Sequence, residues 1–116
     1  LIALLELINT EKLEEEEANY LKMAKDTSSS LLVILNDILD LSKIEEGKLK
    51  LEQVEFNPLE VTQELVKLLF YSAQDKGIQL KLELDYQIPE KLIGDPIRLR
   101  QILMNLVGNA IKFTKE

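Results

Sequence analysis

The sequence predicts an α+β protein in which a helical hairpin precedes a region of mixed helices and strands. Three observations support this prediction. Apolar residues recur at three- and four-residue steps over residues 14–46, as they do in a long amphipathic helix. Residues 78–84 alternate without fault between apolar and polar side chains, which is typical of a half-buried strand. An Asn-Pro pair at 57–58 and an Asp-Pro pair at 95–96 each precede another helical pattern.

The hairpin is predicted from two helical patterns separated by a short polar turn. Residues 1–9 form the first pattern, residues 9–12 (Asn-Thr-Glu-Lys) the turn, and residues 14–46 the second helix. The apolar face of the first pattern consists of Leu1, Leu4, Leu5 and Ile8. The opening residues have no basic segment or initiator methionine before them, so they are interpreted as part of a helix and not as a signal peptide.

The second helix has an apolar face wider than a two-stranded coiled coil needs. One heptad stripe contains Leu21, Ala24, Ser28, Leu31, Leu35, Ile38 and Ser42; a second contains Tyr20, Thr27, Ile34 and Leu41; Leu32 and Leu39 widen both. A face of this width fits a four-helix bundle, and because one hairpin supplies two helices, the simplest bundle is a homodimer. The alternative is that this helix packs on the C-terminal part of its own chain.

The middle of this helix, residues 26–30 (Asp-Thr-Ser-Ser-Ser), contains four small hydroxyl residues in a row, where helix propensity is weak. The segment could be a hinge for signal transmission or a surface where small residues allow close packing. The sequence leaves these two interpretations open.

The remaining elements are predicted from their end signals. Gly47 ends the long helix in a left-handed cap, and residues 48–56 read as a linker with a strand. The Asn57-Pro58 pair, with Glu60 at the third position, starts a helix that runs to about residue 76. Ile88-Pro89 marks a turn. The buried side of the 57–76 helix is predicted to contain Val61, Leu65, Leu68, Leu69, Ser72 and Ala73, and Gly77 is its C-terminal cap.

Composition excludes several classes of protein. The net charge is -7, which argues against nucleic-acid binding. There is no Cys, and so neither a disulfide framework nor a thiolate metal site. There is no His either. No apolar run approaches the roughly 20 residues that span a bilayer, so the segment is expected to be soluble.

The last predicted helix has an unusual polar face. Asn105, Asn109 and Lys112 are spaced i, i+4, i+7 and share one side of an otherwise apolar helix, and Gly108 in its interior costs about 1 kcal/mol relative to Ala. Amide oxygens suit Mg²⁺ and an ammonium suits a phosphate, so a magnesium nucleotide would satisfy both. The alternative is that the amides cap loop backbone and the lysine is simply solvated.

Two long motifs resemble those of sensor histidine kinases. Residues 98–114 (RLRQILMNLVGNAIKFT), with their approach 92–98 (LIGDPIR), resemble the family's N-box. Residues 34–48 (ILNDILDLSKIEEGK) resemble the end of its second dimerisation helix. The resemblance implies an internal fragment: 1–47 from the dimerisation and histidine-phosphotransfer hairpin, 48–56 as linker and first strand, and 57–116 as the N-terminal half of an ATP-binding α/β sandwich.

The resemblance also implies roles for the polar face. Asn109 would coordinate Mg²⁺, Asn105 would support the phosphates and the metal, and Lys112 would contact a phosphate of ATP. ATP-hydrolysing relatives have a Glu where this chain has Asn105, and an amide cannot take a proton from water. Phosphoryl transfer to a histidine, and then to a receiver aspartate, is therefore expected in the parent. The phosphoacceptor histidine and the glycine boxes are not in this sequence, so the fragment alone is expected to be inactive.

The same resemblance implies partners and a location. The chain is expected to form a homodimer through the hairpin and to bind a response-regulator receiver domain, which lies in the same chain if the parent is a hybrid kinase. No binding of nucleic acid is expected. The segment is expected in the cytoplasm, and its parent is expected to be membrane-associated. The competing hypothesis is a non-catalytic dimerisation or scaffold module of a pseudokinase, because the sequence has no His.

Overall fold

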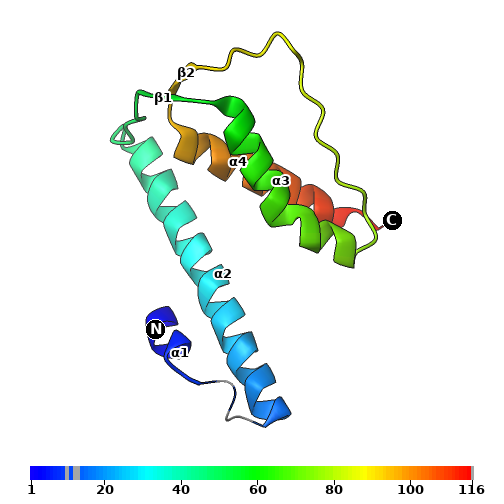
Figure 1. Cartoon of the computed structure of the whole chain (residues 1–116). Coiled ribbons are helices and arrows are strands. Elements are labelled where there is room, and N and C mark those ends of the chain that lie inside the picture. Colours follow the sequence, from blue (N-terminus) through cyan, green and yellow to red (C-terminus); the bar gives the residue numbers. More distant parts are fainter. Residues whose placement is uncertain (10, 12–13, 116) are drawn as a thin grey trace. The chain divides into compact units, whose positions relative to one another are not determined.

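The computed structural model describes residues 1–9, 11 and 14–115. It divides into two compact units, Leu1–Leu49 and Lys50–Glu116, which are described separately. The described residues form helices and one small two-stranded sheet (Figure 1). The α+β prediction is confirmed in this form.

The first unit contains α1 (Ile2–Glu6) and α2 (Glu15–Glu45), which pack against each other. The prediction that the first helix runs to residue 9 is wrong, because α1 ends at Glu6. The side chain of Asn9 accepts a hydrogen bond from the N–H of Glu11 at 3.0 Å. Such a local bond offers the backbone an alternative to continuing a helix. The predicted turn includes Thr10 and Lys12, which lie outside the described residues.

Helix α2 agrees with its prediction to within one residue at each end. Its first turn is closed by a capping box in which the N–H of Glu14 donates to Oε2 of Glu17 at 3.3 Å. Gly47 has φ +66° and closes the other end, as predicted. The N–H of Gly47 donates to the Ile44 carbonyl at 3.0 Å and that of Lys48 to the Lys43 carbonyl at 2.8 Å. This is the pair of bonds of a Schellman motif.

The weak segment at residues 26–30 does not interrupt α2. The hydroxyl of Ser30 donates to the Asp26 carbonyl one turn earlier at 2.9 Å, so its polar group is satisfied within the helix.

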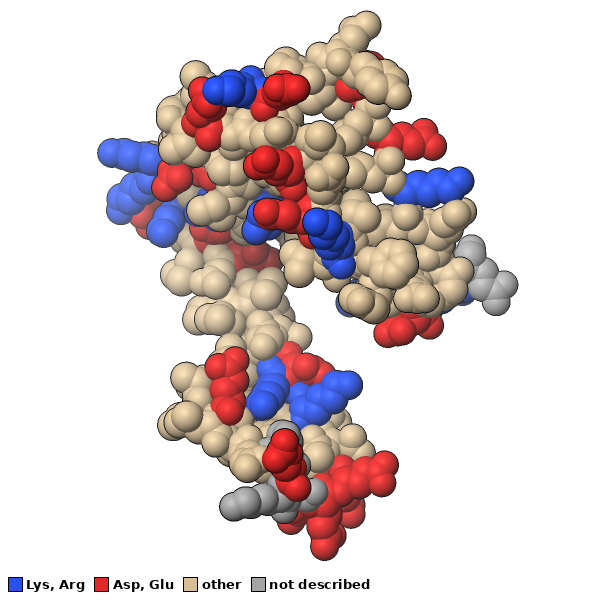
Figure 2. Space-filling model, in the orientation of Figure 1, with Lys and Arg blue, Asp and Glu red and all other residues tan. Residues whose placement is uncertain are grey.

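The apolar face of α2 is mostly uncovered. Leu21 is buried at 8% exposure, but Leu31, Leu35 and Ile38 are 50–62% exposed. The middle of α2 presents mostly uncharged surface, whereas acidic side chains gather near its start (Figure 2). The apolar stripes predicted from the sequence therefore face outward in this structure.

The second unit contains β1 (Val54–Phe56), α3 (Pro58–Asp75), β2 (Leu92–Gly94) and α4 (Pro96–Phe113). The strands pair antiparallel with Glu55 opposite Ile93. Strand β1 lies inside the predicted linker and strand at 48–56, but β2 was not predicted. Helices α3 and α4 lie side by side (Figure 1). The buried residues of this unit are Val61, Leu65, Ala73 and Ile111.

The predicted buried side of α3 is partly wrong. Leu68 is 59% exposed and Ser72 is also exposed. Val61, Leu65 and Ala73 are spaced at multiples of four and form a narrower stripe, so residues that flank this stripe remain outside the core.

Both Pro-containing helix starts are confirmed. Oδ1 of Asn57 accepts from the N–H of Leu59 at 2.9 Å, and Oδ1 of Asp95 accepts from the N–H of Arg98 at 3.0 Å. The second oxygen of Asp95 also accepts from the N–H of Glu52 at 3.1 Å. Asp95 therefore ties the start of α4 to the chain that leads into β1.

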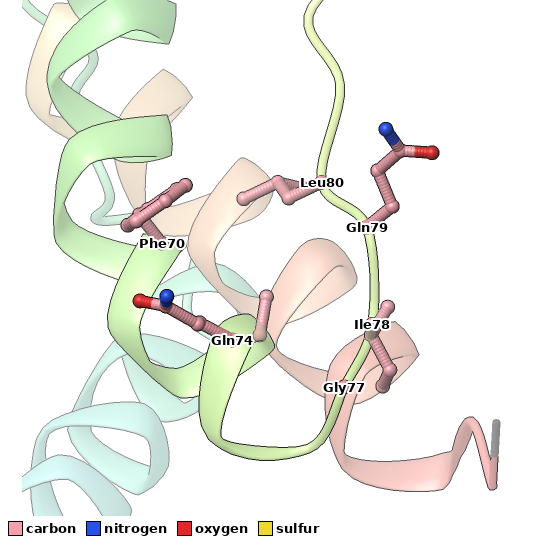
Figure 3. Close-up of a pocket in the computed structure, with 7 residues that line it drawn as sticks. Phe70, Gln74, Gly77, Ile78, Gln79 and Leu80 are labelled. Atoms are coloured by element: carbon pink, nitrogen blue, oxygen red, sulfur yellow. The ribbon is translucent and has the colours of Figure 1, made fainter.

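The predicted strand at 78–84 is not formed. Figure 1 shows an extended trace between α3 and β2, and no other segment pairs with it among the residues described. The alternation itself is present: Leu80 points back toward α3 whereas Gln79 points away (Figure 3). A strand requires a ladder partner, and alternation predicts only which side chains would face a core.

The predicted turn is present at residues 85–88, where the N–H of Ile88 donates to the Asp85 carbonyl at 3.1 Å.

Asp95 predicts a specific pH dependence of stability. Hydrogen bonds from the N–H groups of Arg98 and Glu52 hold the pKa of this carboxyl below its ordinary value of 3.8, against a smaller opposing effect of burial. A lowered pKa stabilises the fold above the pKa of the unfolded chain, and this contribution is lost as the pH falls through the folded value. Asp95→Asn replaces one acceptor oxygen by a donor. The wild-type chain should therefore melt at a higher temperature than D95N at pH 6, and the difference should shrink toward pH 3.

The matched control for this experiment is Glu90→Gln, which removes a charge from an exposed side chain outside the cap. Circular dichroism melts of all three proteins between pH 6 and pH 3 test the prediction. A difference in melting temperature between D95N and the wild-type chain that is the same at every pH would contradict it.

Candidate functional site

Helix α4 is held against α3 along its length. Arg100 of α4 forms an ion pair with Glu64 of α3, and Ile111 is buried at 7% exposure near the other end of α4. Side chains of both helices line a cavity of about 280 Å³; its lining residues are Leu69, Ser72, Lys76, Gly108, Ile111 and Lys112. The C-terminal half of α4 therefore presents one side to α3 and leaves another side for a ligand.

Asn105 and Asn109 lie on the exposed side of α4. Neither carboxamide forms a hydrogen bond within the part of the chain that the structure describes. The alternative in which these amides cap loop backbone is thus not observed there. Two amide oxygens one helical turn apart remain available to an external group.

Lys112 is also exposed, and its ammonium lies 5.5 Å from the centre of the Phe113 ring. No ion pair of Lys112 is present among residues 1–9, 11 and 14–115. Its charge is therefore available to a phosphate. Of the three predicted site residues, only Lys112 lines a cavity described here.

Two larger cavities of the second unit lie away from this face. Figure 3 shows one of about 420 Å³ between the end of α3 and the segment that follows, lined by Phe70, Gln74 and residues 77–80 among others. Another, of about 440 Å³, lies between the start of α3 and residues 82–90. Neither of these two cavities is lined by Asn105 or Asn109.

The end of α4 has a bond that sequence reasoning missed. Nζ of Lys76 donates to the carbonyl oxygens of Ile111 and Lys112, both at 2.8 Å. The carbonyl of Ala110 accepts from the N–H of Thr114 at 3.0 Å and from its hydroxyl at 2.6 Å. The only signal for Lys76 in the sequence is a cation next to the cap glycine of the preceding helix, which does not indicate a contact with α4.

The chemistry of these residues indicates whether they could bind magnesium and a nucleotide. No group of three or more His, Cys, Asp or Glu residues that could hold a metal occurs in the described ranges. A metal at this face would therefore need amide oxygens together with oxygens from the ligand. Among the described residues the amides of Asn105 and Asn109 have no hydrogen-bond partner and Lys112 has no ion pair, so these three groups fit a magnesium-bound phosphate in this respect.

Within the described residues, no helix is both long and apolar enough to span a membrane.

Comparisons with known proteins match both units. Residues 1–47 match the family model of the His Kinase A (phospho-acceptor) domain. The chain is 45% identical over 104 residues to Signal transduction histidine-protein kinase BarA of Escherichia coli (strain K12), which is 90% of this chain and 11% of that protein.

Relatives in eukaryotes are similar over almost the whole chain. The identity is 40% over 114 residues to Probable histidine kinase 3 of Oryza sativa subsp. japonica, covering 98% of this chain and 11% of that protein. The identity is 38% over 114 residues to Hybrid signal transduction histidine kinase E of Dictyostelium discoideum, covering 98% of this chain and 7% of that protein. The chain thus spans about a tenth of the length of the curated relatives it matches.

Gly108 gives a stability prediction for this face. A Cβ at this position would meet no atom within 4 Å, so no close approach among the described residues requires glycine. Gly108→Ala should raise the free energy of unfolding of this chain by about 1 kcal/mol, the helix-propensity difference. Ala110→Gly, at an exposed position of the same helix, should lower it by a similar amount. Urea denaturation measures both changes, and a destabilised G108A protein would contradict the prediction.

Proposed function

We propose that this chain is a segment of a sensor histidine kinase, comprising the end of the dimerisation and phosphotransfer hairpin (1–47), a linker with the first strand (48–56) and the first half of the ATP-binding domain (57–116). The main support is the extent of the similarity. The phospho-acceptor domain matches only residues 1–47, but the similarity to histidine kinases covers 90–98% of the chain and so includes α4.

In the proposed function, the parent protein transfers the γ-phosphate of ATP to a histidine and then to an aspartate of a response-regulator receiver. Bound Mg-ATP supplies the phosphoryl group and the charge of the metal. Asn109 holds the metal through its amide oxygen, Asn105 supports the metal and the phosphates, and Lys112 neutralises phosphate charge. The work of these residues is positioning and charge neutralisation, as is usual in phosphoryl transfer.

The proposal distinguishes a kinase from an ATP hydrolase at one position. Hydrolysis requires a base that removes a proton from attacking water, and a carboxylate can do this. The side chain at 105 is an exposed amide without a hydrogen bond among the described residues. A neutral amide binds and orients but does not accept this proton. Transfer to an amino-acid acceptor therefore suits this face better than hydrolysis does.

The proposed partner at the hairpin is a second copy of the chain. The exposed Leu31, Leu35 and Ile38 form an apolar stripe of the kind that a four-helix bundle buries. Two hairpins would bury this stripe, and the parent would act in the cytoplasm, where it meets its receiver domain. This segment alone is proposed to be inactive, because the sequence contains no His to accept a phosphoryl group.

The absence of His also favours a second candidate, a non-catalytic dimerisation or scaffold module of a pseudokinase. The residues encoded immediately before Leu1 discriminate between the two. A histidine in that segment supports the kinase, and another residue in its place supports the scaffold.

The dimer can be tested at one position of the apolar stripe. Leu35→Asp places a charge in the proposed bundle core, where an unpaired charge is costly. Sedimentation velocity should show a dimer for the wild-type chain and a monomer for L35D, with helical circular dichroism retained. Asn36→Asp adds the same charge one residue away, off the stripe. It should leave the dimer intact; a wild-type chain that is monomeric at tens of micromolar would contradict the proposal.

The metal ligand can be tested in the full-length protein. Asn109→Ala removes the amide oxygen that holds Mg²⁺ and should reduce autophosphorylation from labelled ATP by at least 100-fold, because metal charge stabilises the transferred phosphoryl group. The matched control is Gln63→Ala, which removes an exposed amide from α3 outside the proposed site. Full activity of N109A would refute the assigned role.

A further inference from the structure

The last turn of α4 ends in carbonyl groups that the helix cannot satisfy by itself. The last four carbonyls of any α-helix lack intrahelical partners, and together they form the negative end of the helix dipole. In α4 these belong to residues 110–113. Thr114 satisfies the carbonyl of Ala110 with its N–H and its hydroxyl. The next two carbonyls, of Ile111 and Lys112, are both bound by the ammonium of Lys76 at 2.8 Å.

Lys76 is well anchored to serve as this cap. It follows α3 directly, and its own N–H donates to the Ala73 carbonyl at 3.2 Å. The next residue, Gly77, has φ +68°. The N–H groups of Gly77 and Ile78 close a Schellman motif with Gln74 and Ala73, both at 2.9 Å. The backbone that carries Lys76 is therefore held in place before its side chain reaches α4.

The position of this cation relates to the proposed phosphate site. Asn109 and Lys112 lie in the last two turns of α4, next to the negative end of the helix dipole. An anionic triphosphate near this end would be repelled by the dipole. A cation bound to the terminal carbonyls offsets that repulsion, and it also keeps the last turn from fraying.

We propose that Lys76 is a positioning residue for the magnesium nucleotide: it fixes the end of α4 and neutralises its terminal carbonyls. This inference deepens the proposed function and rests on it, since it concerns the same nucleotide. Lys76 acts through α4 and is not assigned a contact with the ligand.

The first test concerns the cap alone and needs no nucleotide. In the 116-residue chain, Lys76→Met should accelerate hydrogen exchange of the Phe113 and Thr114 amides about 10-fold, as measured by NMR. Lys76→Arg keeps a charged donor and should restore most of the protection. Lys67→Met removes an exposed lysine of α3 that forms no hydrogen bond or ion pair among the described residues, and it should have no effect. Unchanged exchange in K76M would overturn the cap.

The second test concerns the nucleotide. In the full-length protein, K76M should weaken the binding of Mg-ATP about 10-fold by calorimetry and weaken the less charged Mg-ADP by a smaller factor. K76R should recover most of the affinity, and K67M should match the wild type. A merely structural defect would weaken both nucleotides equally. Faster exchange with unchanged affinity, or an equal loss for both nucleotides, would overturn the positioning role.

The two proposals fail in different ways. If Asn109→Ala binds Mg-ATP as tightly as the wild type does, then the nucleotide site itself is wrong, whatever K76M does. If N109A loses binding and K76M does not, then the site stands and only the role of Lys76 is refuted.

Discussion

The second unit depends on α4 being held at both of its ends. At the start, the Asp95 carboxylate accepts from the N–H of Arg98 within the helix and from the N–H of Glu52 before β1. At the end, the ammonium of Lys76 binds two terminal carbonyls of α4. Charged groups of the right sign thus stand at both poles of the helix dipole. Asp95 binds the segment before β1, and Lys76 belongs to the end of α3. Helix α4 is therefore fixed with respect to both neighbouring segments.

The sequence predicted those elements whose ends have local chemical signals. Asn57 and Asp95 cap their helices as expected, and Gly47 and Gly77 adopt the left-handed conformation that ends the preceding helices. These signals are readable because a cap satisfies backbone groups within a few residues. The errors have a different origin. Whether residues 78–84 or 92–94 form a strand depends on pairing with distant residues, and α1 ends at Glu6 although the apolar spacing continues to Ile8. Periodicity carries no information about either.

The candidate site was likewise predictable only where it depends on local sequence spacing. The spacing of Asn105, Asn109 and Lys112 predicted a shared polar face, and the structure leaves all three exposed, with no competing hydrogen bond from the two amides among the described residues. No cavity described here encloses the amides, and spacing along one helix could not have predicted one, because a cavity needs a second wall. Lys76 is 36 residues from Lys112 along the sequence, so its bond to the end of α4 could not be inferred from any local pattern.

Residues 78–84 pair with no other described segment, and this has a practical consequence for handling the chain. Proteases bind their substrates in an extended conformation with open backbone hydrogen-bonding groups, and exposed connecting segments are preferred sites of nicking. Lys81 is exposed in the middle of this segment. A single cleavage after that lysine would leave α3 on one product and α4 on the other, so preparations of this chain should be purified and stored with inhibitors of trypsin-like enzymes.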